Sequence, residues 1–167
     1  IDIAIHTSRP PVEVQPAKIG EADEAIARFA APFIEDGSVL QVGVGAVPDA
    51  IMGLLKDRKD LGVHSGMLGD AVVELAEAGV LTNARKEFDQ GVSVAGALIG
   101  SRRLFDFCDR NPAVAMHAAN YTHNEAVLTK LSRLVTINSA LEVDLTGQVN
   151  AEASGSAYVG GTGGQVD

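Results

Sequence analysis

A glycine-rich turn between an apolar segment and a helix is the first place where this chain could bind a ligand. Gly43 and Gly45 follow a strand-like run at 38–42, and Pro48 stands in the first turn of the predicted helix. Glycine lets the backbone approach a ligand closely, and the free N–H groups that begin a helix attract phosphate, carboxylate or an oxyanion. The spacing lacks the third glycine of a dinucleotide-binding turn, which argues against NAD. An ordinary tight turn explains the same residues.

Four glycines within five residues form a second candidate ligand loop near the end of the chain. They surround Thr162, at positions 160, 161, 163 and 164. Successive N–H groups in such a segment can form an anion-binding nest. A flexible tail has the same composition, so both interpretations stay open.

Single histidine, serine and cysteine side chains carry weaker signals. His64 and Ser65 could be a base and a nucleophile, but neighbours on a strand point to opposite faces. We therefore interpret His64 as a hydrogen-bonding residue at the end of a strand. His117 and His123 have no further ligands at metal-binding spacing, and no metal site is predicted. Cys108 lies among apolar residues and is interpreted as a small core residue.

Charged candidates have structural explanations. Asp70 and Glu74 lie one helical turn apart and fit the first turns of a helix, and the arginine pair at 102–103 fits a solvated surface. Glu142 and Asp144 alternate on a predicted strand, where a structural polar network is the simplest interpretation.

Composition excludes several classes of protein. The chain has 167 residues, of which 46% are hydrophobic, enough for one domain with a sizeable core. A net charge of −9 disfavours nucleic-acid binding, and the single cysteine excludes an internal disulfide framework. No apolar run approaches the ~20 residues of a membrane span, and no signal peptide is visible. We therefore predict a cytoplasmic protein.

Apolar strands alternate with helices, which predicts an α/β fold with an open, mostly parallel sheet flanked by helices. The predicted strands are 38–44, 61–65, 92–99, 134–137, 141–145 and 148–152, and the predicted helices are 19–33, 47–57, 70–78, 102–108 and 125–131. Residues 1–17, which include three prolines, are expected to form a linker or extended arm. Residues 18–167 are expected to form one domain, truncated at its C-terminal end because the chain stops just after a glycine loop.

Several ordered motifs from position 43 onward match a known family. They are GVGAVPDA (43–50), LGVHS (61–65), VLTN (80–83), NSALEVDLTGQVN (138–150) and GGTGGQ (160–165). In this order they resemble the acetyl-CoA hydrolase/transferase family, in particular its 4-hydroxybutyrate CoA-transferase branch. The resemblance covers nearly all of the chain after residue 30. It implies that the chain is most of a C-terminal domain, without a related N-terminal domain and the last strands.

The resemblance implies a CoA-transferase-like fold that takes coenzyme A or an acyl-CoA as substrate and has no tightly bound cofactor. A carboxylic acid would be the second substrate, and the protein would be a homo-oligomer, with no nucleic-acid or membrane partner. The CoA-contacting positions that the resemblance assigns lie in both glycine loops: Gly43, Val44, Gly45, Ala46, Val47, Gly160 and Gly164.

Members of that family move CoA between acids through a glutamate. Its carboxylate attacks the acyl-CoA carbonyl and forms an acyl-glutamyl anhydride, which CoA converts to a glutamyl thioester before a second acid takes over the CoA. The anhydride conserves the free energy of the thioester, which hydrolysis would release. The chemistry also needs an oxyanion hole of backbone N–H groups.

This chain departs from the pattern at the nucleophile, because Gly66 stands directly before Met67 where the family has glutamate. Another group could replace it, with Glu142, Asp70 and Ser65 as candidates. Alternatively, the protein is an acyl-CoA hydrolase in which water enters the vacated space, or a catalytically silent CoA-binding or assembly domain. A deliberate Glu→Gly substitution also fits, and fold analogy alone offers a sugar-phosphate isomerase-like domain. Whether the chain is an enzyme stays open at this point.

Overall fold

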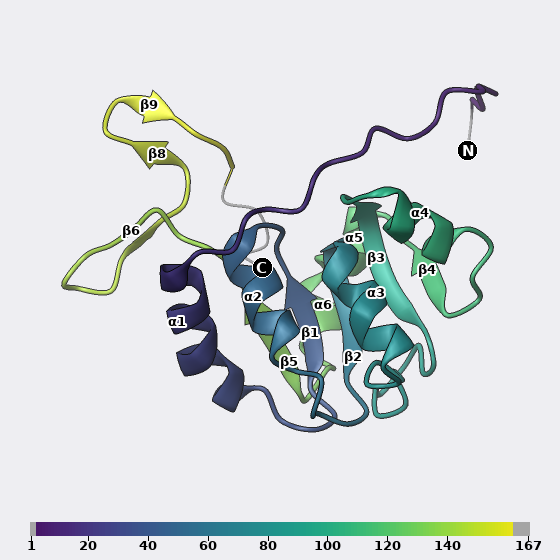
Figure 1. Cartoon of the computed structure of the whole chain (residues 1–167). Helices are drawn as coiled ribbons and strands as arrows, with labels where there is room; N and C mark the ends of the chain where they lie inside the picture. Colours follow the sequence, from purple (N-terminus) through teal and green to yellow (C-terminus); the bar gives the residue numbers. More distant parts are fainter. Residues whose placement is uncertain (1–2, 162–167) are drawn as a thin grey trace.

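A five-stranded parallel sheet forms the centre of the computed structural model, which describes residues 3–161 (Figure 1). The strands stand in the order β4-β3-β2-β1-β5, and every pairing between neighbours is parallel. Their bounds are Val39–Val42 (β1), Gly62–Leu68 (β2), Ser93–Leu98 (β3), Val114–Met116 (β4) and Leu134–Ile137 (β5). The predicted α/β fold with an open, mostly parallel sheet is confirmed.

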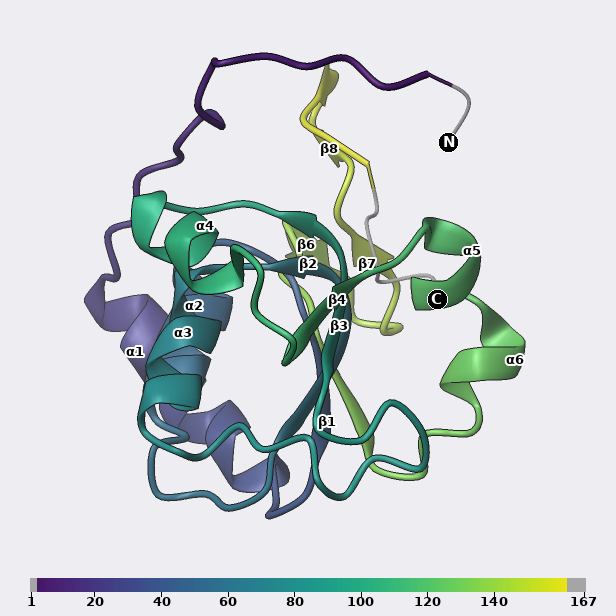
Figure 2. The ribbon, with the colours of Figure 1, turned by 90° about the vertical axis from the view of Figure 1, so that its right-hand side faces the viewer.

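Helices cover both faces of the sheet (Figure 2). One face carries α1 (Glu21–Ala30), α2 (Ala46–Gly53), α3 (Asp70–Glu77) and α4 (Arg102–Cys108), and the other carries the short helices α5 (Ala119–Thr122) and α6 (Glu125–Leu128). A 3-10 turn, Ala31–Phe33, continues α1. Because both faces are covered, the central strands are buried, as expected for a parallel sheet.

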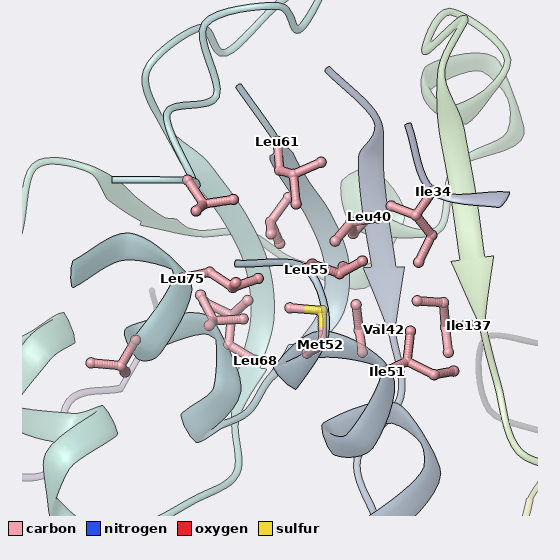
Figure 3. Close-up of a cluster of buried hydrophobic side chains, with 14 of the residues drawn as sticks. Ile34, Leu40, Val42, Ile51, Met52, Leu55, Leu61, Leu68, Leu75 and Ile137 are labelled. Carbon is pink, nitrogen blue, oxygen red and sulfur yellow. The ribbon is translucent and has the colours of Figure 1, made fainter. Parts of the chain in front are cut away.

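The hydrophobic core lies between the sheet and the larger helical layer. Leu40 and Val42 occupy alternate positions of β1, so both point toward the same layer, where they join Met52 of α2 and Leu75 of α3 (Figure 3). Leu40 is 0% exposed and Met52 is 1% exposed. Burial of each such side chain contributes roughly 1.5–3 kcal/mol, so this layer is the main source of stability.

A buried polar cluster fixes the amino ends of β2 and β3. Asn83 accepts a hydrogen bond from the Val63 N–H (2.8 Å) and donates one to Ser93 Oγ (3.0 Å). Lys86 is 1% exposed, and its Nζ donates to the carbonyl oxygens of Val63 (3.1 Å) and Val92 (2.7 Å). Burial lowers the pKa of Lys86 from 10.5 to about 8.

Two antiparallel hairpins and an extended arm lie outside the sheet (Figure 1). The hairpins pair β6 (Glu142–Val143) with β7 (Val149–Asn150), and β8 (Ala153–Ser154) with β9 (Ala157–Tyr158). The strands predicted at 141–145 and 148–152 are thus shorter than expected and pair with each other. Residues 3–20 form no helix or strand, and both views show this arm crossing above the carboxyl ends of the strands.

Three differences from the predicted elements bear on the site. β2 continues to Leu68 and so contains Gly66, although the sequence predicts that this strand ends at Ser65. The sequence predicts neither β4 nor α5, because three and four residues are too few for a periodic pattern. Helix α2 ends at Gly53, earlier than the predicted boundary at 57.

The buried Lys86 should make stability depend on pH. Its folded-state pKa is about 8 and its ordinary value is 10.5, so between these values the unfolded chain holds a proton that the folded chain has lost. Stability therefore rises with pH through this window. Urea unfolding of the wild type and Lys86→Met at intervals from pH 7 to 10 should show the wild type gaining about 1–3 kcal/mol relative to the variant. A constant or shrinking difference would contradict the assignment.

Candidate active site

The turn after β1 lies at the carboxyl edge of the sheet, where open parallel sheets bind their ligands. The Gly43 N–H donates to the Ile137 carbonyl oxygen (2.9 Å), which joins the turn to β5. Gly45 has φ 130° and ψ 179°, a backbone conformation open almost only to glycine. Helix α2 begins at the next residue, Ala46. The turn therefore brings the free N–H groups of a helix start to the edge of the sheet.

The extended arm closes one side of this edge. The Val14 N–H donates to the Gly100 carbonyl oxygen (3.0 Å), and the Arg102 N–H donates to the Glu13 carboxylate (2.9 Å). A pocket of about 150 Å³ lies between the arm at 14–17 and the loops that follow β1, β2 and β3. The arm thus forms a wall of the pocket.

Carboxylates make this pocket acidic. Asp49 and Asp70 line it, and Asp70 accepts hydrogen bonds from the N–H (2.9 Å) and the hydroxyl (2.7 Å) of Ser101. Burial raises the pKa of Asp49, and the charges of Asp70 and Glu74 raise it further. A phosphate group is disfavoured here, whereas an uncharged ester or thioester is tolerated.

On the opposite face of the sheet, the ring of His123 occupies the space in front of Gly66. A Cβ atom on Gly66 would lie 2.5 Å from both Cε1 and Nε2 of His123, and 3.7 Å from its Nδ1. These separations are far below van der Waals contact, so the observed approach of the ring requires glycine at position 66. The position that the resemblance assigns to the nucleophile therefore faces an imidazole.

Glycine on the neighbouring strand supports the same close approach. The register pairs Ser65 with Ala95 and Met67 with Ala97, so Gly96 lies beside Gly66. A Cβ atom on Gly96 would lie 2.8 Å from the Gly66 carbonyl oxygen and 3.5 Å from Thr122 Oγ1. Thr122 Oγ1 lies 2.8 Å from His123 Nδ1. Small residues on β2 and β3 thus make room for Thr122 and His123.

The histidine and serine before Gly66 have structural surroundings. Ser65 is 0% exposed, and its hydroxyl accepts from the Val42 N–H (3.1 Å) and donates to the Val42 carbonyl oxygen (3.1 Å). His64 is 0% exposed and packs against the rings of Phe88 and Tyr121, and burial followed by the charge of Lys86 lowers its pKa. Within residues 3–161, neither ring nitrogen of His64 meets hydrogen-bond geometry with a partner. His64 lies within β2 and not at the end of a strand, so that part of our interpretation is wrong, and its ring fills an aromatic cluster.

Other candidate residues lie elsewhere. Glu142 is exposed on β6 and accepts a hydrogen bond from Asn150 (2.8 Å), and no hydrogen bond or ion pair joins it to β2 in the part of the chain that the structure describes. The Gly160 N–H donates to the Glu152 carbonyl oxygen (3.2 Å). Gly164 lies outside the described residues. The sequence therefore assigned CoA contacts to a loop that the structure describes only at its start.

Surface and core assignments fit the structure. Arg102 pairs with Asp106, Arg103 pairs with Glu77, and burial raises the pKa of the half-buried Cys108 thiol. Residues 3–161 contain no group of three or more His, Cys, Asp or Glu side chains able to hold a metal ion. No helix in this described range has both the length and the apolar character needed to cross a membrane.

Comparison with known proteins identifies the family to which the C-terminal part of this chain belongs. Residues 100–167 match the sequence model of the acetyl-CoA hydrolase/transferase C-terminal domain. These residues belong to that family. The resemblance predicted from the motifs is confirmed, and with it the CoA-transferase-like fold.

Two curated relatives of this chain are named as CoA-transferases. The 4-hydroxybutyrate coenzyme A transferase of Clostridium kluyveri is 44% identical over 167 residues, which are 100% of this chain and 39% of that protein. The succinyl-CoA:acetate/propanoyl-CoA:succinate CoA transferase of Fasciola hepatica is 40% identical over 161 residues, 96% of this chain and 34% of that protein. The chain thus spans less than half the length of these relatives.

Two solved structures share the arrangement of this chain. RipA from Yersinia pestis superposes with a TM-score of 0.84 at 34% identity, over 87% of this chain and 34% of that one. The 4-hydroxybutyrate CoA-transferase from Porphyromonas gingivalis superposes with a TM-score of 0.81 at 35% identity, over 84% of this chain and 36% of that one.

Sequence reasoning missed the contact between His123 and Gly66. The sequence presents it as an isolated histidine, weighed only as a metal ligand. Its neighbour in space, Gly66, lies on another element and has no side chain to mark the contact. Only the placement of α5 against β2 brings the two together.

The contact between Gly66 and His123 can be tested by unfolding. Gly66→Ala should lower the free energy of unfolding by about 1–3 kcal/mol, because its Cβ would overlap the His123 ring. His123→Ala in the same chain should recover much of that loss, giving a coupling energy of about 1 kcal/mol or more in urea titrations. Gly53→Ala is the matched control, because a Cβ there meets nothing within 4 Å. Additive effects of the two substitutions would contradict the contact.

Proposed function

We propose that this chain binds acyl-CoA thioesters at the carboxyl ends of β1 and β2 and takes part in cleaving the thioester bond. The carrying observation is the turn through Gly45 into α2, which presents N–H donors after β1, the strand that pairs with β2, and β2 carries the position that the resemblance assigns to the nucleophile. Such donors stabilise the oxyanion that forms when a thioester carbonyl is attacked. The CoA-transferases among its relatives support the same substrate class.

Charge favours one orientation of the ligand. The acidic pocket beside Asp49 and Asp70 repels phosphates, so the uncharged thioester end belongs near the turn and the nucleotide end belongs elsewhere. We place the nucleotide end at the loop that contains Gly160 and Gly164. Coenzyme A is then a substrate, with no tightly bound cofactor.

The last part of the proposal concerns the residues of the relatives that this chain does not match. The chain covers 39% of the Clostridium kluyveri relative, so a further domain on the N-terminal side is proposed to close the site and to bind the carboxylic acid. A homo-oligomer in the cytoplasm is the proposed assembly and location.

Calorimetric titration of the protein at its full natural length with CoA and acetyl-CoA tests this site first. We expect binding in the micromolar range. Gly45→Ala should weaken it about tenfold or more, because a side chain strains the backbone at φ 130° and moves the N–H groups. Gly79→Ala is the matched control, with φ 73° and open space around its Cβ at the far end of α3. Equal loss in both variants, or no binding by the folded wild type, would refute the proposal.

A catalytically silent CoA-binding domain is the second candidate, because Gly66 offers no carboxylate. Introducing a carboxylate at position 66 distinguishes the two candidates, and the structure shows which second substitution is needed. Gly66→Glu alone places a side chain against the His123 ring, so CoA transfer from acetyl-CoA to a second acid is expected only in Gly66→Glu/His123→Ala. CoA transfer is measured by mass spectrometry of the CoA esters, and Gly53→Ala is the control variant that should behave as the wild type does.

Failure of the double variant to transfer CoA would favour the silent domain. Glu142 stays a second candidate for the nucleophile. If it acts in that role, Glu142→Gln abolishes the transfer catalysed by the otherwise wild-type protein.

A further inference from the structure

A small cavity begins at the glycine turn after β1, beside the start of α2. Its volume is about 150 Å³, and Val44 and Gly45 of the turn form part of its lining. A protein cavity of that volume can hold a ligand of roughly six heavy atoms, such as benzene. The cavity therefore has room for a short acyl chain and no room for the nucleotide of CoA.

The extended arm and the loop after β3 complete the lining. Val14, Pro16 and Ala17 line the cavity from the arm, and Ile99 and Gly100 line it from the loop. The hydrogen bond from the Val14 N–H to the Gly100 carbonyl oxygen joins these two segments (3.0 Å). Apolar residues on both sides suit the methylene groups of a ligand.

The charged residues that line the cavity are both acidic. Asp70 accepts hydrogen bonds from the N–H (2.9 Å) and the hydroxyl (2.7 Å) of Ser101, which fix its carboxylate in place. Among residues 3–161, no protein group donates a hydrogen bond to the Asp49 carboxylate, so its oxygens are available to a ligand. Arg103 lines the adjoining cavity and is paired with Glu77. Within the described part of the chain, no lysine or arginine on the lining offsets the two carboxylates.

We propose that this cavity receives the acyl chain of the thioester and makes the protein selective for short, uncharged acyl groups. The inference rests on the proposed function, because it requires the thioester carbonyl at the turn through Gly45. A chain inside the cavity lies beside Asp49 and Asp70. A terminal carboxylate, as in a succinyl group, adds a third negative charge with no positive charge on the lining to offset it. A butyryl group has the same number of carbon atoms and no charge.

Asp49 is the residue that determines this selectivity. Burial raises its pKa, and the charges of Asp70 and Glu74 raise it further, so a negative charge is already disfavoured at this place. Asp70 is bound to Ser101 at the start of α4 and has a structural role. Replacement of Asp49 by asparagine removes the charge and keeps the size of the side chain, so it tests the charge alone.

Calorimetric titration of the protein at its full natural length with butyryl-CoA, succinyl-CoA and free CoA tests the role of charge. The wild type should bind succinyl-CoA about tenfold or more weakly than butyryl-CoA, because like charges meet in the cavity. Asp49→Asn should remove most of this difference by raising the affinity for succinyl-CoA, with the affinity for free CoA unchanged. Asp109→Asn is the matched control, an equal change of charge just after α4, and should keep the wild-type ratio.

A side chain at position 69 tests the size of the cavity. A Cβ atom on Gly69 would lie 3.8 Å from the Ile99 carbonyl oxygen, 3.9 Å from Asp49 Oδ1 and 4.0 Å from Val44 Cγ1, so it fits without overlap among residues of the lining. Gly69→Leu should lower the affinity for butyryl-CoA about tenfold or more, with a smaller effect on acetyl-CoA and none on free CoA. Gly53→Leu is the matched control, because a Cβ there meets nothing within 4 Å.

Three results would overturn the inference. They are equal affinity of the wild type for butyryl-CoA and succinyl-CoA, an unchanged ratio of these affinities in Asp49→Asn, and an equal loss of affinity for butyryl-CoA and free CoA in Gly69→Leu. In each case the wild type still binds CoA esters, so the proposed function stands and only the assignment of the acyl chain to this cavity falls. A folded wild type that binds no CoA ester would instead refute the proposed function, and the inference with it.

Discussion

The close approach of α5 to β2 is the constraint on which the site depends. β2 lies at the centre of the sheet, tied to β1 by the hydroxyl of Ser65 and to the following loop by Asn83 and Lys86. Its backbone cannot move to accommodate a larger neighbour without breaking these bonds. Glycine at 66 is therefore what allows the His123 ring to lie against the strand, and the ring in turn determines what chemistry the space can support.

The carboxyl edge of the sheet is electrostatically divided. On the side of the large helices, Asp49 and Asp70 line a pocket that the arm closes. On the side of α5, the polar groups near β2 include the His123 imidazole and the Thr122 hydroxyl, with the Asp89 carboxylate bonded to the Tyr121 hydroxyl. The turn through Gly45 separates the two sides and supplies donors rather than charge. A neutral carbonyl fits this boundary better than a phosphate does, which is the reason for proposing that the thioester, and not the nucleotide, binds there.

The sequence predicted the elements that have strong boundaries. α4 has the predicted bounds, because the arginine pair at 102–103 and the Asn-Pro break at 111–112 enclose a short apolar helix. β5 also agrees, as a compact β-branched run. The site was predictable only on the side of the glycine turn, whose signal lies in consecutive residues. The contact between Gly66 and His123 joins two elements, one of them a helix of four residues, and single-sequence periodicity carries no information about it.

The space in front of Gly66 connects the structure to the choice of acyl acceptor, because it holds either a side chain of residue 66 or the ring of His123. A side chain on residue 66 and the ring of His123 cannot both occupy it, because the Cβ atom alone would lie 2.5 Å from the ring. A carboxylate there would form a covalent anhydride and keep the free energy of the thioester for a second acid. With glycine at position 66, the ring of His123 fills that space instead, and any carboxylate introduced there needs the ring to be removed or displaced.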